Sequence, residues 1–393
     1  MAEYIPFITG EETAKLVRRL YSDSEIIRVP LDRARNFLGI LNRSSGVWID
    51  PMVDGLDDLE TRRSKRDKRN PWFDFMSAFT NFDKIGTTAY HATPVSSEVN
   101  MFVKATMDKC ATYRPKWITV PQLPLVNDSG RNKVNRMLAA AAGKWKSTCA
   151  FSGKLILPIV VTHQSQVSGK TMRNPKVKQA ERCYHEAGAD GFWVVDSSLT
   201  DDNGSSTLRK RFRTIMDLHQ ELNEQISSKI RIGGPYWGLN MVLWARGLVD
   251  HPAIGVGLGY QYFLAGSPTR QAKARLALSS LRRRVSVAPQ LKSWLDTAIG
   301  KLAASHPARD EFIEIRRQFT ALSELDAARE QVAKFYKHWL DPVGLTPKAG
   351  RSMALFQDLS AAYALGKSLP EITGEGTARR PEAVAEPLML SCL

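Results

Sequence analysis

Short apolar runs alternate with longer segments of helical periodicity through most of the first 260 residues. The runs are rich in Val, Ile and aromatic residues, which favour strands. The segments between them repeat apolar positions every three or four residues, as one face of a helix does. This alternation predicts parallel βαβ units with strands at residues 26–30, 46–50, 85–91, 117–121, 155–163, 191–196, 230–234 and 253–259.

The segments between the runs also carry signals for helix ends. Residues 129–147 begin at Asp128 or Ser129, either of which is a good N-cap. Residues 174–189 place Pro175 in the first turn, where a missing N–H costs nothing. These signals support the alternation of strands with helices.

Eight strand–helix units within about 250 residues favour a (β/α)8 TIM barrel, because such barrels need eight repeats and have about this length. An open doubly wound parallel sheet is the alternative, since it is built from the same units. We expect the barrel over residues 1–289, with a basic insertion at 56–84. Its closing helix is predicted over 267–286, with Ser267 as N-cap and Pro268 at the first position.

Beyond the barrel the pattern becomes entirely helical. Residues 290–368 are predicted as a helical appendage, because apolar positions from Phe312 to Leu322 form an amphipathic stripe. Residues 369–393 are rich in Pro, Glu and Ala, and we expect them to be a flexible tail.

The charge balance points to a class of partner. The chain has 393 residues, 43% of them hydrophobic, which is enough for a large core. Its 55 Lys and Arg residues outnumber the 40 Asp and Glu residues, giving a net charge of +15. Such an excess attracts polyanions, and nucleic acid, either tRNA or DNA, is the expected partner.

Other partners and compartments receive less support. No stretch approaches the roughly 20 apolar residues that cross a bilayer, and the first residues lack the order of a signal peptide. We therefore expect a cytoplasmic protein with no membrane partner. The four cysteines are widely spaced and form no metal-binding pattern, so neither a metal nor another cofactor is predicted.

Polar residues at the ends of the runs are the candidates for chemistry, because TIM-barrel active sites lie at the carboxyl ends of the strands. Asp50, Asp196 and His163 are the candidate catalytic residues. The two carboxylates could be general base and electrostatic stabiliser, or base-recognition groups, and His163 a general acid or phosphate donor. Asp196 could instead cap the following helix, and His163 could be a hydrogen-bonded core residue. His91 would end the third run.

Several residues near the same strand ends are candidate substrate contacts. The run at 253–259 fails the dinucleotide pattern GxGxxG, because position 260 is Tyr. Its glycines suit instead the phosphate site that TIM barrels form after strands seven and eight, or they only let a crowded strand pack. The candidate substrate-binding residues are Gln122, Gln164, Gly233, Gly234, Tyr236, Gly257, Gly259 and Tyr260, with Trp237 and Tyr262 as further stacking residues.

Residues 163–171, HQSQVSGKT, end like a phosphate-binding P-loop. Gln164 stands where that motif needs its first glycine, and Pro175 predicts that no helix starts at Lys170. We expect a loop in which Lys170 can still contact phosphate.

Two basic segments are predicted to follow a nucleic-acid backbone. Residues 251–295 contain no Asp or Glu, and the insertion contains TRRSKRDKR. Clusters of this kind neutralise phosphates. The residues concerned are Arg62, Arg63, Lys65, Arg66, Arg270, Lys273, Arg282, Arg283 and Arg284.

Four segments together resemble the tRNA-guanine transglycosylase superfamily, which includes DNA relatives that insert a 7-deazaguanine. They are VWIDPMVDG, LPIVVTHQ, GFWVVDSSL and IRIGGPYWGLNMVLWARGLVD. The resemblance implies a TIM barrel that exchanges a base, with Asp50 as general base or base-binding carboxylate and Gln164 as a base-recognition amide. The family's nucleophilic Asp falls where this chain has Ile254, Gly255 and Val256, and the family's Cys and His zinc cluster is absent.

The sequence therefore leaves more than one function open. The first is a nucleic-acid- or nucleotide-acting TIM-barrel protein that modifies bases. The second is a non-catalytic nucleic-acid-binding or scaffold subunit of a defence or modification complex, with other protein subunits as partners. A phosphometabolite lyase or aldolase is less favoured, because no strand end supplies a lysine for a Schiff base.

Overall fold

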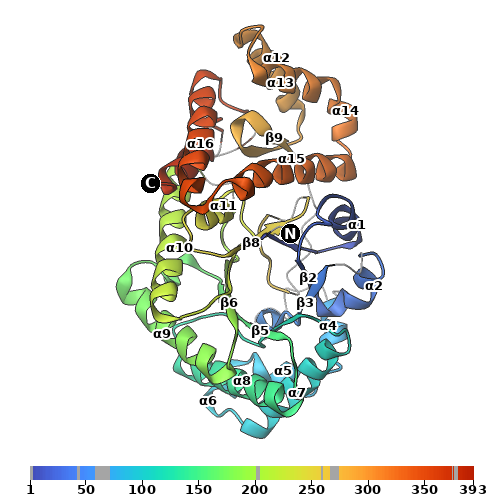
Figure 1. Cartoon of the computed structure of the whole chain (residues 1–393), viewed down its shortest axis with the longest axis vertical. Helices are drawn as coiled ribbons and strands as arrows, with labels where there is room; N and C mark the ends of the chain where they lie inside the picture. The colour runs from blue at the N-terminus through green and yellow to red at the C-terminus, as the bar shows by residue number, and fades with distance from the viewer. Residues whose placement is uncertain are drawn as a thin grey trace.

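The chain forms a closed barrel of eight parallel strands, surrounded by helices (Figure 1). The computed structural model describes residues 3–41, 45–57, 71–200, 204–257, 260–265, 274–373, 375 and 379–393. The strands are neighbours in chain order, and they are β1 (Ile5–Phe7), β2 (Ile26–Pro30), β3 (Gly46–Asp50), β4 (Trp117–Thr119), β5 (Lys154–Val161), β6 (Gly191–Asp196), β7 (Arg231–Gly233) and β8 (His251–Gly255). The predicted (β/α)8 barrel is confirmed, and the open sheet is excluded.

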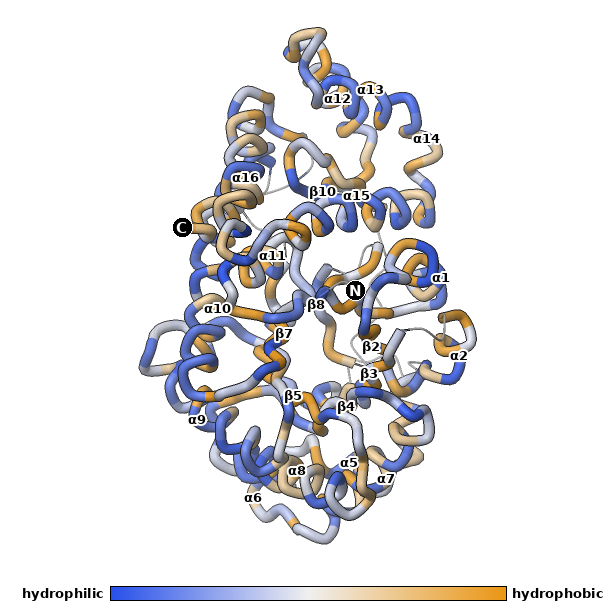
Figure 2. Tube along the Cα trace, in the orientation of Figure 1, coloured by the Kyte–Doolittle hydropathy of each residue, from blue (hydrophilic) through white to orange (hydrophobic). Residues whose placement is uncertain are grey.

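Aromatic side chains fill the centre of the barrel. The ring of Phe7 lies 5.5 Å from that of Trp48 and 5.3 Å from that of Trp193, and the two Trp rings lie 5.5 Å apart. These edge contacts between rings from three strands make the interior a packed core. Figure 2 shows the same distribution, with apolar residues gathered along the strands and hydrophilic residues on outer helices such as α9 (Lys170–Ala187).

One predicted strand is wrong, and one strand was not predicted. Residues 85–91 lie in α5 (Phe82–Ile85) and α6 (Thr88–Ala92), where the Thr87 hydroxyl caps α6 by accepting from the Tyr90 N–H. The missing strand is β1, which has only three residues and so shows no periodicity of its own. His91 accordingly does not end a strand. Its Nε2 lies 2.9 Å from the carbonyl oxygen of Ile85.

The helices between the strands are mostly where the pattern placed them. In α8 (Ser129–Thr148), the Asp128 carboxylate accepts from the Arg131 N–H at 2.6 Å, which confirms the predicted cap. The expectation that no helix begins at Lys170 is wrong, because α9 begins there and contains Pro175. A proline early in a helix removes a single backbone hydrogen bond, which the rest of this long helix tolerates.

The remaining barrel helices complete the outer ring. They are α1 (Glu11–Leu20), α2 (Ala34–Leu38), α4 (Pro71–Met76), α7 (Ser96–Ala111), α10 (Ser205–Gln225) and α11 (Leu239–Ala245), together with the 3-10 turn η2 (Val53–Leu56).

The segment after the barrel differs from the prediction. In place of a closing helix over 267–286, the described part forms an antiparallel hairpin of β9 (Arg275–Leu278) and β10 (Arg283–Ser286). Leu276 and Leu278 are buried in one hydrophobic cluster and Ala277 between them in another, a strand alternation that the many helix-forming residues obscured. Ser267 and Pro268 lie outside the described residues.

The C-terminal helices lie at one side of the barrel (Figure 1). They are α12 (Pro289–Lys301), α13 (Pro307–Arg317), α14 (Phe319–Leu322), α15 (Leu325–Leu345), α16 (Arg351–Ser368) and α17 (Ala385–Ser391). Of these helices, α15, α16 and α17 contact the barrel. The Tyr336 hydroxyl of α15 donates to Asn240 Oδ1 of α11 at 2.6 Å. In the segment predicted as a flexible tail, α17 instead packs against α16 and α10, with Ala385 and Leu388 buried.

Candidate functional site

A buried ion pair occupies the mouth of the barrel. Arg28, from β2, donates through Nε to Asp50 Oδ2 at 3.0 Å and also pairs with it through Nη2. The other Asp50 oxygen accepts from the Met52 N–H at 2.9 Å. Both side chains are 2% exposed. Asp50 is therefore the counterion of Arg28, and both of its carboxylate oxygens are hydrogen-bonded.

Aromatic rings enclose the guanidinium of Arg28. Its central carbon lies 4.9 Å from the ring centre of Phe7 and 5.8 Å from those of Trp193 and Tyr262. Contacts of this kind between a cation and ring faces are strongest when water is excluded. Tyr262 lies beyond the end of β8, which is two strands from β2 around the closed barrel, and its ring borders the ion pair.

The mouth contains a second carboxylate, Asp54 of η2, which the sequence reasoning missed. Asp54 Oδ2 accepts from the Tyr262 hydroxyl at 2.9 Å. Burial, and then the negative charge of Asp50, raise the pKa of Asp54 to about 7. The available signal was the second Asp in the turn DPMVDG.

Protein side chains fill the described part of the mouth around Arg28. Leu264 and Ala265 are buried after Tyr262. A side chain at Gly55 would lie 2.6 Å from Ala265 Cβ and 2.7 Å from the Trp72 ring, so the segments are in direct contact. Tyr262 and Ala265 thus lie against η2 at the carboxyl ends of the strands, the end at which TIM barrels bind substrate.

Asp196 lies at the end of β6 and has one carboxylate oxygen without a partner. Its Oδ1 accepts from the backbone N–H and the hydroxyl of Ser198, at 2.8 and 2.6 Å. Its Oδ2 is buried and has no hydrogen-bond partner among the described residues. Burial raises the pKa of Asp196, against the hydrogen bonds from Ser198. Asp196 does not cap α10, which begins nine residues later, after Gly204.

The three predicted catalytic residues do not form one constellation. His163 follows β5, the neighbour of β6, and its charge slightly opposes the rise in the pKa of Asp196. The His163 side chain is exposed, with Nδ1 3.4 Å from the Ser165 hydroxyl. Asp50 lies on β3, three strands away, and is paired with Arg28.

The two glutamines have different surroundings. Gln122 donates through Nε2 to the carbonyl oxygens of Pro121 and Asn135, at 2.8 and 2.9 Å, and so joins β4 to α8. The Nε2 atom of Gln164 is buried and has no hydrogen-bond partner among the described residues. Gln164 therefore has a free donor near the ends of β5 and β6, whereas Gln122 has a structural role.

The glycines after β7 and β8 are in close contact with protein. A side chain at Gly233 would lie 3.0 Å from Val249 Cγ1. Gly234 and Gly257 have φ angles of +97° and +72°, and a Cβ at Gly257 would lie 3.2 Å from Arg329 of α15. These contacts agree with the alternative in which the glycines permit packing. Gly259 lies outside the described residues.

The predicted stacking residues are also part of the core. Tyr236 and Tyr260 are 1% and 2% exposed. The Tyr260 ring lies 4.8 Å from that of Trp237 and 4.5 Å from that of Tyr336. These rings join the barrel to α15, so their faces are not free to stack on a base in this conformation.

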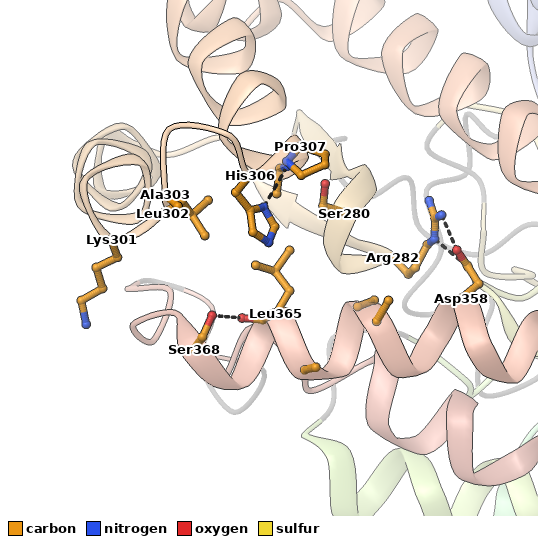
Figure 3. A pocket seen from close by; sticks show the side chains of 14 residues that line it. Ser280, Arg282, Lys301, Leu302, Ala303, His306, Pro307, Asp358, Leu365 and Ser368 are labelled. Carbon is orange, nitrogen blue, oxygen red and sulfur yellow. Dashed lines mark hydrogen bonds and ion pairs between the residues drawn. The ribbon is translucent and has the colours of Figure 1, made fainter.

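The three consecutive arginines of the hairpin hold the C-terminal part together. Arg282 lies in the wall of a cavity of about 700 Å³ between the hairpin and α16 (Figure 3). It forms a bidentate pair with Asp358 of α16. Arg283 is 1% exposed and lies 3.5 Å from Glu375. Arg284 is 4% exposed and packs on Trp237. Arg283 and Arg284 are therefore too buried to present a surface to phosphates, and Arg282, which is partly exposed, is paired with Asp358.

The other predicted phosphate contacts lie outside the described residues. They are Arg62, Arg63, Lys65, Arg66, Arg270 and Lys273.

A cationic surface lies on α9, and of its residues the sequence pointed only to Lys170 as a phosphate contact. Lys170, Lys178 and Arg182 are exposed and recur on one face of the helix, with Asn174 between them. They line a groove of about 630 Å³ that also contacts Asn132 of α8. None of the three cations has an ion-pair partner among the described residues, and the lining includes no carboxylate. The available signal was the absence of Asp and Glu from residues 163–180.

Comparison with known proteins leaves the family open. The chain matches no protein-family model, and the search of curated proteins found no relative. Within the described residues, no helix is long and apolar enough to span a membrane, and no cluster of three or more His, Cys, Asp or Glu side chains could hold a metal ion. The four cysteines are free thiols.

The ion pair at the mouth gives a stability prediction. Replacing Arg28 by Met leaves Asp50 buried without its counterion, and we expect a loss of about 3–5 kcal/mol in unfolding free energy. Urea denaturation measures this loss of unfolding free energy. Arg209→Met is the control, because Arg209 is exposed on α10. An Arg28→Met loss no larger than that of the control would show that the pair is not needed.

The raised pKa of Asp54 gives a pH prediction. The folded protein binds this proton up to about pH 7, whereas an ordinary Asp releases it near 3.8. The stabilisation that Asp54 gives to the folded protein is therefore fully present below pH 3.8 and is lost as the pH rises through about 7. The unfolding free energy falls by at most about 1.4 kcal/mol per pH unit over this range.

Asp54→Asn should remove this decline in unfolding free energy between pH 4 and 7. The exposed Asp83→Asn is the control. An unchanged pH profile in Asp54→Asn would contradict the assignment.

Proposed function

We propose that this protein binds nucleic acid along the groove between α8 and α9. The observation that carries the proposal is the row of exposed cations Lys170, Lys178 and Arg182, which have no carboxylate partner among the described residues. The net charge of +15 adds a long-range attraction for polyanions. Binding of this kind depends on phosphates and needs no base contacts.

The dimensions of the row suit a nucleic-acid backbone. Lys170 and Arg182 are twelve residues apart, a distance of about 18 Å along a helix. A strand that rises about 3.4 Å per nucleotide covers this length with several phosphates. The polar side chains of Thr171 and Asn174 line the same groove and can donate hydrogen bonds to phosphate oxygens.

The state of the barrel mouth favours binding over catalysis as the principal function. Asp50 is neutralised by Arg28, and the Tyr262 ring lies beside the guanidinium of Arg28. Asp50 and Asp196 end β3 and β6, and His163 follows β5, so the predicted catalytic residues come from separate strands.

A second candidate function is base modification at the barrel mouth, as the resemblance to the transglycosylase superfamily implies. It is favoured by one observation, the unpartnered Oδ2 of Asp196 in a buried position. A carboxylate oxygen of this kind can accept a hydrogen bond from a nucleobase or take a proton from it. Base modification at the barrel mouth requires Tyr262 and its neighbours to move before a base can enter.

The principal proposal predicts salt-dependent binding of labelled tRNA or duplex DNA by fluorescence anisotropy. Changing Lys170, Lys178 and Arg182 together to Glu should make the fall of log affinity with log salt less steep. The magnitude of the slope should decrease by about 2–3, because three phosphate contacts are lost. The control changes Lys292, Lys301 and Lys367 to Glu, which alters the charge equally on the C-terminal helices. Equal losses in both triple variants, or no binding by the natural chain at low salt, would contradict the proposal.

The second candidate predicts incorporation of radiolabelled guanine into tRNA or DNA. Asp196→Asn should reduce the incorporation rate by about 100-fold or more, the usual effect of losing an acid–base group. Ser198→Ala tests whether the turn around Asp196 matters by itself. Absence of incorporation by the natural chain in both nucleic acids would exclude this reaction.

A further inference from the structure

A cationic pocket lies at the opposite end of the barrel from the mouth. Arg231 begins β7 and Asp250 precedes β8, so the pocket is at the amino-terminal ends of the strands. Its volume is about 340 Å³, and α16 begins at its edge. Four cations line it, namely Arg231, Arg246, Lys348 and Arg351.

Only two of these cations are neutralised by carboxylates. Arg231 forms a bidentate pair with Asp250, at 2.8 and 2.9 Å, and Arg351 pairs with Glu3 at 3.0 Å. Burial alone would raise the pKa of Asp250, but the hydrogen bonds and charge of Arg231 bring it below its ordinary value. Both carboxylates are therefore committed as counterions.

The other two cations are left without counterions. Arg246 donates to the backbone carbonyl of Ser391 at 3.1 Å and has no carboxylate partner among the described residues. Lys348 is exposed and has no ion pair within the described part of the chain. The pocket thus holds an excess of two positive charges, to which the positive end of α16 adds.

The walls of the pocket limit the kind of anion that fits. Arg351 lies over the Trp244 ring, with its central carbon 4.3 Å from the ring centre, so this ring face is already covered. An aromatic ligand therefore has no free surface for stacking there. The volume is at the small end of the range for ligand pockets.

We propose that this pocket binds a small phosphorylated anion, with diphosphate as the simplest example. Arg246 and Lys348 supply the charge that the ligand neutralises, while Arg231 and Arg351 are held in place by their own carboxylates. Guanidinium groups match phosphate oxygens in pairs, and a lysine adds a point charge.

A bound anion would connect several segments that are distant in the sequence. Arg246 follows α11 and contacts the end of α17, and Lys348 precedes α16. Arg351 contacts Glu3, near the first strand. The ligand would thereby tie the barrel to its C-terminal helices, and its binding should raise the thermal stability of the chain.

The test is the melting temperature of the full chain with sodium diphosphate, compared with NaCl at the same ionic strength. We expect diphosphate to raise Tm by about 2 °C or more at saturation. Changing Arg246 and Lys348 together to Glu should abolish the shift, and the milder Arg246→Gln with Lys348→Gln should weaken diphosphate binding about tenfold or more by calorimetry. The control pair Lys301→Glu and Lys367→Glu should keep the natural shift.

No shift with the natural chain, or an unchanged shift in both pocket variants, would overturn the proposal. A rise in Tm with a single-stranded oligonucleotide but not with diphosphate would also overturn the proposal, since the pocket would then belong to a nucleic-acid surface. The variant of Lys170, Lys178 and Arg182 separates the two proposals. It should keep the diphosphate shift whether or not it binds nucleic acid.

Discussion

The pairing of Arg28 with Asp50 is the constraint on which the barrel mouth depends. Taking two charges out of water costs several kcal/mol each, on the order of 20 kcal/mol per ion in the limit of a dry interior. The hydrogen bonds between them and the surrounding aromatic rings must offset that cost. Removing either partner would leave the other buried and unpaired.

This one pair explains several features of the mouth. It fixes Asp50 as a counterion, although its place at a strand end is typical of a catalytic carboxylate. It provides the guanidinium face on which Tyr262 packs, and Tyr262 in turn contacts Asp54. The negative charge of Asp50 then helps to raise the pKa of Asp54. The closed mouth is thus a consequence of how a buried arginine is satisfied.

The other cations fall into two groups, those paired inside the protein and those exposed on its surface. Arg282, Arg283 and Arg284 are used inside the protein, where they join the hairpin to α16 and to the aromatic cluster. Lys170, Lys178 and Arg182 of α9 are exposed and have no ion-pair partner among the described residues. A net positive charge predicts a class of partner, but only the structure shows which cations remain available to it.

The fold could be predicted from the sequence further than the site could. The alternation of apolar runs and helical segments is a local property, and it identified seven of the barrel strands, from β2 to β8. It failed at 85–91, where Gly86 and Thr87 support helical turns, and at β1, which is a strand only because β2 and β8 pair with it. In the hairpin, strand periodicity competed with helix-forming residues, and pairing between the two strands decided the outcome.

The partners of the site residues could not be read from the sequence in the same way. Asp50 and Asp196 were correctly placed at strand ends, but Arg28 lies in the middle of β2 and Tyr262 follows β8. Arg28 meets Asp50 because β2 pairs with β3, and Tyr262 lies beside Arg28 because the barrel closes through β8 and β1. The unpaired row on α9 was visible as a segment without acidic residues, yet its exposure depends on how α8 and α9 pack.

Ultraviolet crosslinking of the full chain to bound tRNA, followed by mass spectrometry of the attached peptides, tests the central claim most directly. Nucleic-acid binding along α8 and α9 predicts crosslinked peptides from residues 129–148 and 170–187. Crosslinks confined to the hairpin and the C-terminal helices, at residues 275–368, would contradict it.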